Sequence, residues 1–255
     1  MVKGKEHCLW VKNKLLSLIK DHCGDEVIGK SGGILYSSYS TVKPGEYMIF
    51  GVNPGGDPAH MSQWTIEYDI EYKYKKSVEG NNKEAWSEYI DEIWNGQKAG
   101  ESIFQRRIRS MSEFLFGYES NLREICALNS VFIRSKNEKE INYELFNFFW
   151  PVHEFLIKMV QPRCIITIGI KPYEFLHKKF REYGSRKVYE KKIPASHGNW
   201  KIRISKIKEP SGLVDKPIVI LGIPHLSRYE VSGKEQIFDK VKKSLNELQE
   251  ADYVQ

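Results

Sequence analysis

The sequence predicts an α/β protein with a central, mostly parallel sheet flanked by helices. Two apolar runs, residues 164–169 and 217–223, have the length and continuity of strands that are buried on both faces. Segments whose apolar residues recur at helical spacing separate the strand-like runs along the chain. A chain of 255 residues can bury about 70–75% of its unfolded surface in one core. Disorder, a disulfide-stapled mini-protein and an obligate metal scaffold are therefore disfavoured.

Each element follows from a local pattern. The first helix is expected over residues 6–21, because apolar residues recur there at helical spacing and His22-Cys23-Gly24 supplies a stop. A strand over residues 47–52 is cut off by Asn53-Pro54-Gly55-Gly56-Asp57-Pro58, a cluster of turn formers. The other expected helices are 102–116, 141–160 (with Pro151 inside it), 172–180 and 235–248; the other expected strands are 125–133, 164–169, a hairpin of 187–193 and 200–207, and 217–223.

We expect a single domain over residues 1–255, with an N-terminal helical extension (about 1–45) and an aromatic and acidic insertion (about 61–100) that is irregular or partly helical. No apolar run approaches the about 18 residues that a bilayer span needs. The first residues also lack the apolar region of a secretory signal. An intracellular, monomeric protein with no membrane partner is therefore expected. The four cysteines form no C-x-x-C pair, which indicates structural thiols rather than a metal site.

The formal net charge of +6 is unevenly distributed. Residues 151–255 carry 20 basic and 12 acidic side chains, whereas residues 61–100 carry 5 basic and 8 acidic ones. A lopsided basic balance is typical of proteins that bind polyanions, although many ordinary enzymes share it. If the partner is a nucleic acid, the C-terminal part should face its phosphates and the acidic insertion should lie off that face.

Three loops follow expected strands, and in parallel α/β sheets ligands bind where loops leave the carboxyl ends of strands. The loops begin at Asn53, near Asn129 and at His225. Each side chain alone also has a structural explanation: Asn53 in a turn, Asn129 as a capped strand-end amide, and His225 as a satisfied histidine at a core edge. Their common placement at strand ends favours a shared functional site.

Three short motifs occupy these places: Gly51-Val52-Asn53-Pro54-Gly55, Leu128-Asn129-Ser130-Val131 and Pro224-His225-Leu226-Ser227. Their order and strand context resemble the uracil-DNA glycosylase superfamily over about residues 47–248, with the 61–100 insertion outside the resemblance. The G-x-N-P-G pattern is similar to the single-strand-selective monofunctional and mismatch-specific branches, and the histidine favours the first of these. The cysteine spacing of the iron–sulfur branches is absent. The resemblance implies a three-layer α/β/α fold of the glycosylase type.

The resemblance also implies a chemical role for each motif. Base removal passes through an oxocarbenium-like sugar while negative charge collects on the departing pyrimidine. Asn53 would position the attacking water, His225 would donate a hydrogen bond to the leaving base, and Asn129 would bind the Watson–Crick edge of a flipped base. Because an amide is a poor general base, Asn53 is expected to orient the water rather than to deprotonate it.

The first motif, which starts at Gly51, also predicts the shape of the base pocket. The uracil-specific branch has a tyrosine that closes off C5 of the base, whereas this chain has Gly55. A glycine leaves room at C5, so 5-substituted pyrimidines such as 5-hydroxymethyluracil are expected substrates. The resemblance places an aromatic stacking partner about a dozen residues beyond Asn53. Trp64 is expected to take this role, with Tyr68 behind it.

The last motif departs from the family pattern. His225-Leu226-Ser227-Arg228-Tyr229 lacks both prolines of H-P-S-P-L, and Tyr229 stands where a leucine wedge enters the vacated base stack. Tyr229 is expected to fill that gap, and Arg228 is expected to reach a phosphate. Ser227, Arg134 and Lys234 are the further candidates for phosphate contact.

The expected activity is that of a monofunctional DNA glycosylase acting on uracil or a modified pyrimidine in DNA, without metal or cofactor. No lysine lies in the three motifs, and Schiff-base lyase chemistry needs an amine at the sugar. One alternative is a catalytically inactive DNA- or nucleotide-binding module of the same fold. Another is a defence enzyme that removes hypermodified bases from phage DNA, which the open C5 position and the insertion suggest.

Overall fold

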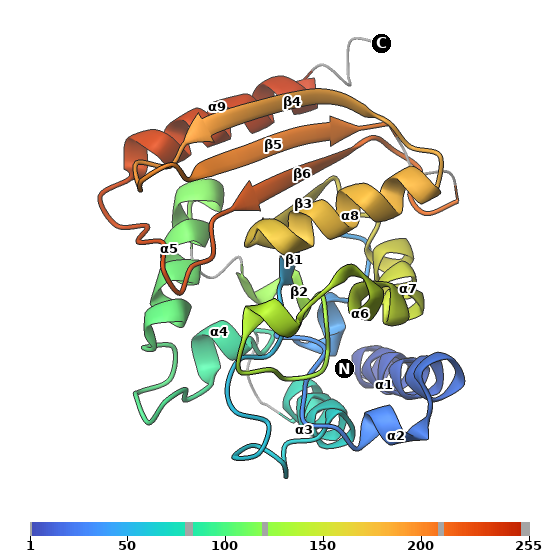
Figure 1. Cartoon of the computed structure of the whole chain (residues 1–255). Helices are drawn as coiled ribbons and strands as arrows, with labels where there is room; N and C mark the ends of the chain where they lie inside the picture. The colour runs from blue at the N-terminus through green and yellow to red at the C-terminus, as the bar shows by residue number, and fades with distance from the viewer. Residues whose placement is uncertain (1, 80–83, 119–121, 209–211, 251–255) are drawn as a thin grey trace. The chain divides into compact units, whose positions relative to one another are not determined.

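The computed structural model describes residues 2–79, 84–118, 122–208 and 212–250. The fold is α/β, as predicted: six strands form a mostly parallel mixed sheet that is flanked by helices (Figure 1). The chain divides into two compact units. Unit 1 is Met1–Ser87 with Arg123–Gln161, and unit 2 is Glu88–Leu122 with Pro162–Gln255. The expectation of a single domain stays a prediction. Within the described ranges, no helix is both long and apolar enough to span a bilayer.

Unit 1 contains two parallel strands and the helices packed around them. Its elements are α1 (Val2–Cys23), α2 (Asp25–Ile28), η1 (Tyr39–Thr41), β1 (Tyr47–Gly51), α3 (Ile66–Val78), β2 (Cys126–Asn129), η3 (Glu138–Glu140), α6 (Tyr143–Phe148) and α7 (Trp150–Val160). The register of β1 and β2 pairs Gly51 with Asn129. Because parallel strands end at the same sheet edge, the first two motifs lie next to each other.

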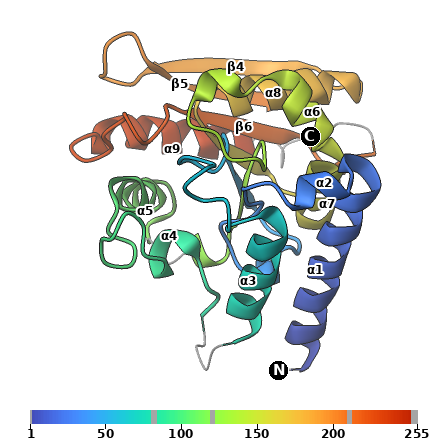
Figure 2. The same ribbon diagram turned by 60° about the horizontal axis from the view of Figure 1, so that its bottom comes forward.

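The predicted insertion is partly helical and supplies core residues to unit 1. Helix α3 lies beside α1 (Figure 2), and an ion pair of 2.6 Å joins Lys12 Nζ to Glu71 Oε1 between them. Ile66 and Ile70 on α3 are fully buried. Residues 80–83 of the insertion lie outside the described residues.

Unit 2 contains a four-stranded part of the sheet in the order β3-β6-β5-β4. Its elements are α4 (Glu88–Asp91), α5 (Ile103–Phe116), β3 (Cys164–Ile168), α8 (Ile170–Glu182), β4 (Lys187–Pro194), β5 (Lys201–Ile207), β6 (Ile218–Ile223) and α9 (Glu235–Glu250). Strands β3 and β6 are parallel and entirely buried, which explains their continuous apolar sequences. The predicted hairpin of β4 and β5 is confirmed. Helix α9 lies along this hairpin (Figure 1).

Two predicted elements differ from the structure. The single helix expected over residues 141–160 is instead two helices, α6 and α7, which meet at Phe149. Pro151 causes the break, because its ring would clash with the carbonyl one turn back, whereas it fits the first turn of a new helix. The strand expected over residues 125–133 ends at Asn129. Beyond it the chain pairs with other segments, as in the isolated bridge between Ile133 and Gly32.

A buried histidine lies beneath the ends of β1 and β2. His153 is fully buried, and its Nε2 donates to the carbonyl oxygen of Ser130 at 2.8 Å. Its Nδ1 has no partner in the described part of the chain. The surrounding rings are those of Phe50, Phe132, Phe146 and Trp150. Burial disfavours the charged imidazolium and lowers the pKa of His153 to about 3.

This histidine should make the stability of the protein depend on pH. Between its ordinary pKa of 6.5 and its native pKa of about 3, the unfolded chain binds a proton that the native chain does not. The free energy of unfolding should therefore decrease as the pH falls below about 6.5, by at most roughly 1.4 kcal/mol per pH unit. Urea denaturation at pH values from 7 to about 5, above the range where carboxylates titrate, measures this slope.

The variant His153→Phe should flatten the pH dependence, because phenylalanine suits the aromatic surroundings and does not titrate. The comparison variant is His177→Phe, since burial lowers the pKa of His177 to about 4. His177→Phe should remove the contribution of His177 to the pH dependence of the free energy of unfolding and leave the contribution of His153. A wild-type slope in His153→Phe would contradict the assignment.

Candidate functional site

Asn53 leaves β1 with its amide fixed in one orientation. Its Nδ2 donates to the carbonyl oxygen of Pro54 and to Ser135 Oγ, both at 3.0 Å. Its Oδ1 accepts no hydrogen bond from the described residues. The half-buried side chain therefore presents an acceptor oxygen, which is the group that could hold a proton of a water molecule.

Arg134 holds the loop that contains Asn53. Its Nη1 donates to the carbonyl oxygen of Gly55, and its Nε donates to Ser31 Oγ at 3.2 Å. The backbone N–H of Arg134 donates to the carbonyl oxygen of Ser31 at 2.9 Å. Arg134 is one of the residues predicted as candidates for phosphate contact. In the structure its guanidinium bonds its own unit and sets the shape of the loop, and phosphate contact stays a prediction.

Gly55 is exposed and has space around it. A Cβ at this position would meet no other described atom within 4 Å, and its φ lies outside the left-handed region. The next residue differs, because Gly56 has a φ of 104°, which favours glycine. A side chain at Gly55 would therefore cause no backbone strain, whereas a side chain at Gly56 would.

Asn129 ends β2 and is only 1% exposed. Its Nδ2 donates to the carbonyl oxygen of Gly33 at 3.1 Å, and its backbone N–H donates to the carbonyl oxygen of Ile34 at 3.0 Å. Its Oδ1 accepts no hydrogen bond from the described residues and lies 3.2 Å from where a Cβ on Gly51 would stand. Gly51 therefore leaves room for an amide that keeps one acceptor oxygen and one N–H uncommitted.

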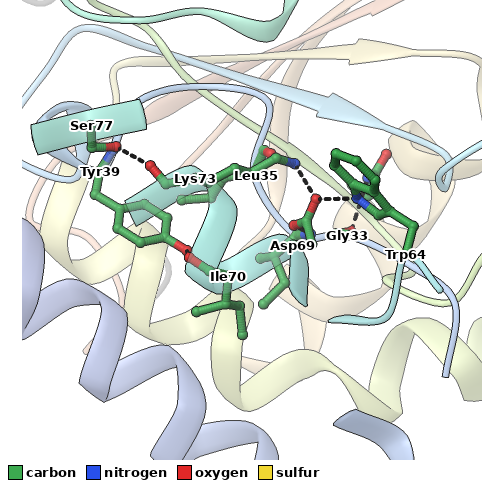
Figure 3. Close-up of polar contacts among 10 residues, drawn as sticks. Gly33, Leu35, Tyr39, Trp64, Asp69, Ile70, Lys73 and Ser77 are labelled. Atoms are coloured by element: carbon green, nitrogen blue, oxygen red, sulfur yellow. Dashed lines mark hydrogen bonds and ion pairs between the residues drawn. The ribbon is translucent and has the colours of Figure 1, made fainter. Parts of the chain in front are cut away.

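A buried ion pair that we did not predict joins Asp69 to Lys73, and Asp69 lies against Gly33, the residue that binds this amide (Figure 3). Asp69 Oδ1 accepts from Lys73 Nζ at 2.8 Å and from Trp64 Nε1 at 3.1 Å, and Asp69 Oδ2 accepts from the backbone N–H of Ile34 at 3.2 Å. Lys73 also donates to the carbonyl oxygen of Leu35. Both charged side chains are 3% exposed. The signal was available, because Asp69 and Lys73 are four residues apart on the helix face that also carries buried isoleucines.

Trp64 and Tyr68 lie together at the start of α3. Their ring centroids are 4.9 Å apart, and the Trp64 ring also contacts Tyr72 at 5.1 Å. Tyr68 is 47% exposed, whereas Trp64 is half-buried and its indole N–H is bound to Asp69. The structure therefore provides an anchored aromatic ring at position 64 with a more exposed ring beside it.

His225 lies in unit 2, in the loop after β6, and Ser227 contacts its Nδ1. The backbone N–H of Ser227 donates to its Nδ1 at 3.3 Å, and Ser227 Oγ lies 2.8 Å from the same nitrogen. Because Nδ1 accepts, the proton of the neutral ring is on Nε2. Arg107 anchors the loop by donating to the carbonyl oxygen of Leu226 at 2.8 Å and by pairing with Glu230 at 2.9 Å. In the neutral form of the ring, these contacts favour the tautomer in which Nε2 carries the proton and can donate it in a hydrogen bond.

Two residues of this loop, Tyr229 and Lys234, bond other residues of unit 2, and their predicted DNA contacts stay predictions. Tyr229 is fully buried, and its hydroxyl donates to the carbonyl oxygen of Ala195 at 3.0 Å. Lys234 Nζ lies 4.3 Å from that ring and donates to the carbonyl oxygens of Ala195 and Ser196. In this structure Tyr229 is a core residue rather than a wedge, because its aromatic surface is packed inside unit 2. Ser227 and Arg228 are exposed, as a DNA contact requires.

The predicted site residues therefore form two groups, one in each unit. Unit 1 holds Gly51, Asn53, Gly55, Trp64, Tyr68, Asn129 and Arg134, and unit 2 holds His225, Ser227, Arg228, Tyr229 and Lys234. Unit 1 brings the two asparagine-bearing strand ends together through its backbone. The N–H of Ser130 donates to the carbonyl oxygen of Gly51 at 2.9 Å, and that of Val131 donates to Val52 at 3.0 Å.

Replacing Asp69 should show how much unit 1 depends on the buried ion pair. The variant Asp69→Asn leaves the Lys73 ammonium buried without its anion, which should lower the free energy of unfolding by about 3–5 kcal/mol. Chemical denaturation measures the loss. The control is Glu71→Gln on the same helix, whose half-exposed ion pair with Lys12 should contribute only about 0–1 kcal/mol. Equal losses in the two variants would contradict the special role of Asp69.

Neither a scan against protein-family models nor a search of curated proteins finds a match for this chain. The assignment of a function therefore rests on the chemistry of these residues.

Proposed function

We propose that the protein is a monofunctional DNA glycosylase. It would hydrolyse the N-glycosidic bond of a flipped uracil or 5-substituted pyrimidine in DNA and leave an abasic site. One observation carries the proposal: Asn53 and Asn129 lie on adjoining strand ends, each with its amide nitrogen bonded to the protein and its oxygen left as an acceptor. Hydrolysis of this kind needs one such group for water and another for the base.

The amide of Asn129 suits the imide edge of a uracil-type base. Its free Oδ1 would accept from N3–H of the base, and its second Nδ2 hydrogen would donate to O4. Cytosine has an acceptor at N3 and an amino donor at C4. The amide would therefore set its oxygen against the acceptor and its N–H against the donor, and neither pair can form a hydrogen bond. The hydrogen bond from Nδ2 to Gly33 prevents the amide from turning over to suit cytosine. Uracil and its 5-substituted relatives are therefore the proposed substrates.

The proposed chemistry divides the work between three residues. Asn53 Oδ1 accepts a hydrogen bond from water and directs it at C1′ of the sugar. Charge that develops on the base oxygen as the bond breaks is stabilised by the Nε2–H of His225. The backbone and hydroxyl of Ser227 support this role, because they keep the proton of the imidazole on the donating nitrogen. The bond between C1′ and the base nitrogen breaks with its electron pair leaving on the base. Water then adds to C1′ and loses one proton to solvent, and the departing base anion takes up one proton from solvent, so the products are the abasic sugar and the neutral base.

Alanine substitutions test these roles. Asn53→Ala and His225→Ala should each lower the rate of base release by about 10²–10⁴-fold, while DNA binding persists, because neither side chain holds the backbone of DNA. The assay is alkali-dependent strand cleavage on a panel of oligonucleotides that each carry one modified pyrimidine. His22→Ala, an exposed histidine at the end of α1, is the control and should keep full activity. Full activity in either site variant would end the proposal.

The open position at Gly55 predicts the breadth of the substrate range. Gly55→Tyr should place a ring at the C5 side of the pocket without backbone strain, because φ at this position suits any residue. Release of 5-hydroxymethyluracil should fall at least about tenfold relative to release of uracil, the loss expected from a steric misfit of 1–3 kcal/mol. The ratio of the two kcat/KM values on the same oligonucleotide measures the change. An unchanged ratio would show that Gly55 does not face C5.

One observation favours a second candidate, a DNA- or nucleotide-binding module without catalysis. A glycosylase has to fill the base stack that it vacates, and Tyr229, the expected wedge, is buried in unit 2. Purified protein that retards modified DNA on a gel but makes no abasic sites would support this candidate. Both candidates require a basic DNA-binding face, so binding should weaken steeply with added salt in either case.

A further inference from the structure

We propose that Asp69 is a positioning residue for the base-binding site, a role that rests on the proposed function. Its carboxylate accepts three hydrogen bonds, one each from Trp64 Nε1, Lys73 Nζ and the backbone of Ile34. One of these donors is the predicted stacking ring itself. Another belongs to the segment that orients Asn129. Asp69 thus connects the two groups that would contact opposite parts of a flipped base, its face and its edge. Figure 3 shows Asp69 beside Trp64 and Gly33.

The connection to Trp64 is direct. Its indole N–H lies 3.1 Å from Asp69 Oδ1, and the indole has no other polar atom with which to fix its orientation. Contacts with the rings of Tyr68 and Tyr72 define the remaining position of the plane. A stacking plane that is already oriented costs less entropy when a base binds to it.

The connection to Asn129 passes through Gly33 and Ile34. Asp69 Oδ2 accepts from the N–H of Ile34, and the preceding residue, Gly33, lies against the same carboxylate. A Cβ at Gly33 would stand 2.8 Å from Asp69 Oδ1, so only glycine lets the segment approach this closely. The carbonyl oxygen of Gly33 then accepts from Asn129 Nδ2 at 3.1 Å. Moving this segment would turn the amide that reads the base.

Lys73 allows Asp69 to serve as a pure acceptor. The ammonium lies 2.8 Å from Asp69 Oδ1 and stabilises the ionised carboxylate in a site that is almost free of solvent. An asparagine at position 69 would turn a donor toward one of the groups that now donate to the carboxylate. The same geometry therefore requires an acidic residue at 69 and a cation at 73.

Two variants and one control test the proposal. Trp64→Phe keeps an aromatic ring but removes the indole N–H. The double variant Asp69→Asn/Lys73→Met replaces one acceptor oxygen by an NH2 donor without leaving a buried charge. If the double variant does not fold, Trp64→Phe tests the proposal by itself. The control is Glu71→Gln/Lys12→Met, which removes the other ion pair of helix α3, and it should behave as the wild type.

The measurement compares binding of two oligonucleotides, one with 2′-fluoro-2′-deoxyuridine, which resists hydrolysis, and one with a tetrahydrofuran abasic analogue. The wild type should bind the first more tightly. In each site variant, the ratio of the two affinities should fall about tenfold, which is the effect of one or more misaligned hydrogen bonds. Affinity for the abasic oligonucleotide should stay unchanged, which distinguishes positioning from a general loss of structure. KM for uracil release should rise in parallel.

Each outcome decides between distinct conclusions. A wild-type protein that releases uracil, with site variants that keep the full preference, overturns the role of Asp69 and leaves the proposed function standing. Equal weakening on both oligonucleotides also overturns it, because the residue would then be merely structural. A wild-type protein that releases no base and shows no preference overturns the proposed function, and the positioning role with it.

Discussion

The buried ion pair of Asp69 and Lys73 is the interaction on which the geometry of unit 1 depends. An ionised carboxylate on a side chain that is 3% exposed persists only if hydrogen bonds and an opposite charge replace the water it has lost. Lys73 supplies the charge, and Trp64 and Ile34 supply the remaining donors. The carboxylate in turn constrains these donors, because each donor must lie within hydrogen-bonding distance of it. Helix α3 is thereby joined to the segment around Gly33.

Parallel pairing of β1 and β2 supplies the second constraint. Gly51 and Asn129 are separated by almost 80 positions in the chain but are partners in register. Glycine at position 51 lets the Asn129 oxygen come close, and the loop after β1 is held by Arg134. The pairing of the two strands and the room left by the missing side chain at Gly51 therefore place the two amides. The orientation of the amides does not depend on a direct contact between them.

Much of the fold could be predicted from the sequence, because strands buried on both faces and amphipathic helices have distinctive patterns. The break at Phe149 could have been predicted from Pro151, because proline suits the first turn of a helix better than its interior. Asp69 shows a different failure. In the sequence it is one of several charges in an aromatic and acidic stretch, and a local pattern does not show that the chain 35 positions earlier covers it.

The sequence by itself determined the α/β class, the order of strands and helices, and the residue types at three strand ends. These properties depend on near neighbours along the chain, so a local pattern is enough. Only the tertiary structure decided which atoms of those residues remain available. The amides of Asn53 and Asn129 are oriented because Ser135 and Gly33 accept from their nitrogens. Tyr229 packs inside unit 2, and Ala195 accepts from its buried hydroxyl. Hydrogen-bonding partners are distant in sequence, and a buried polar atom must find one wherever the fold provides it.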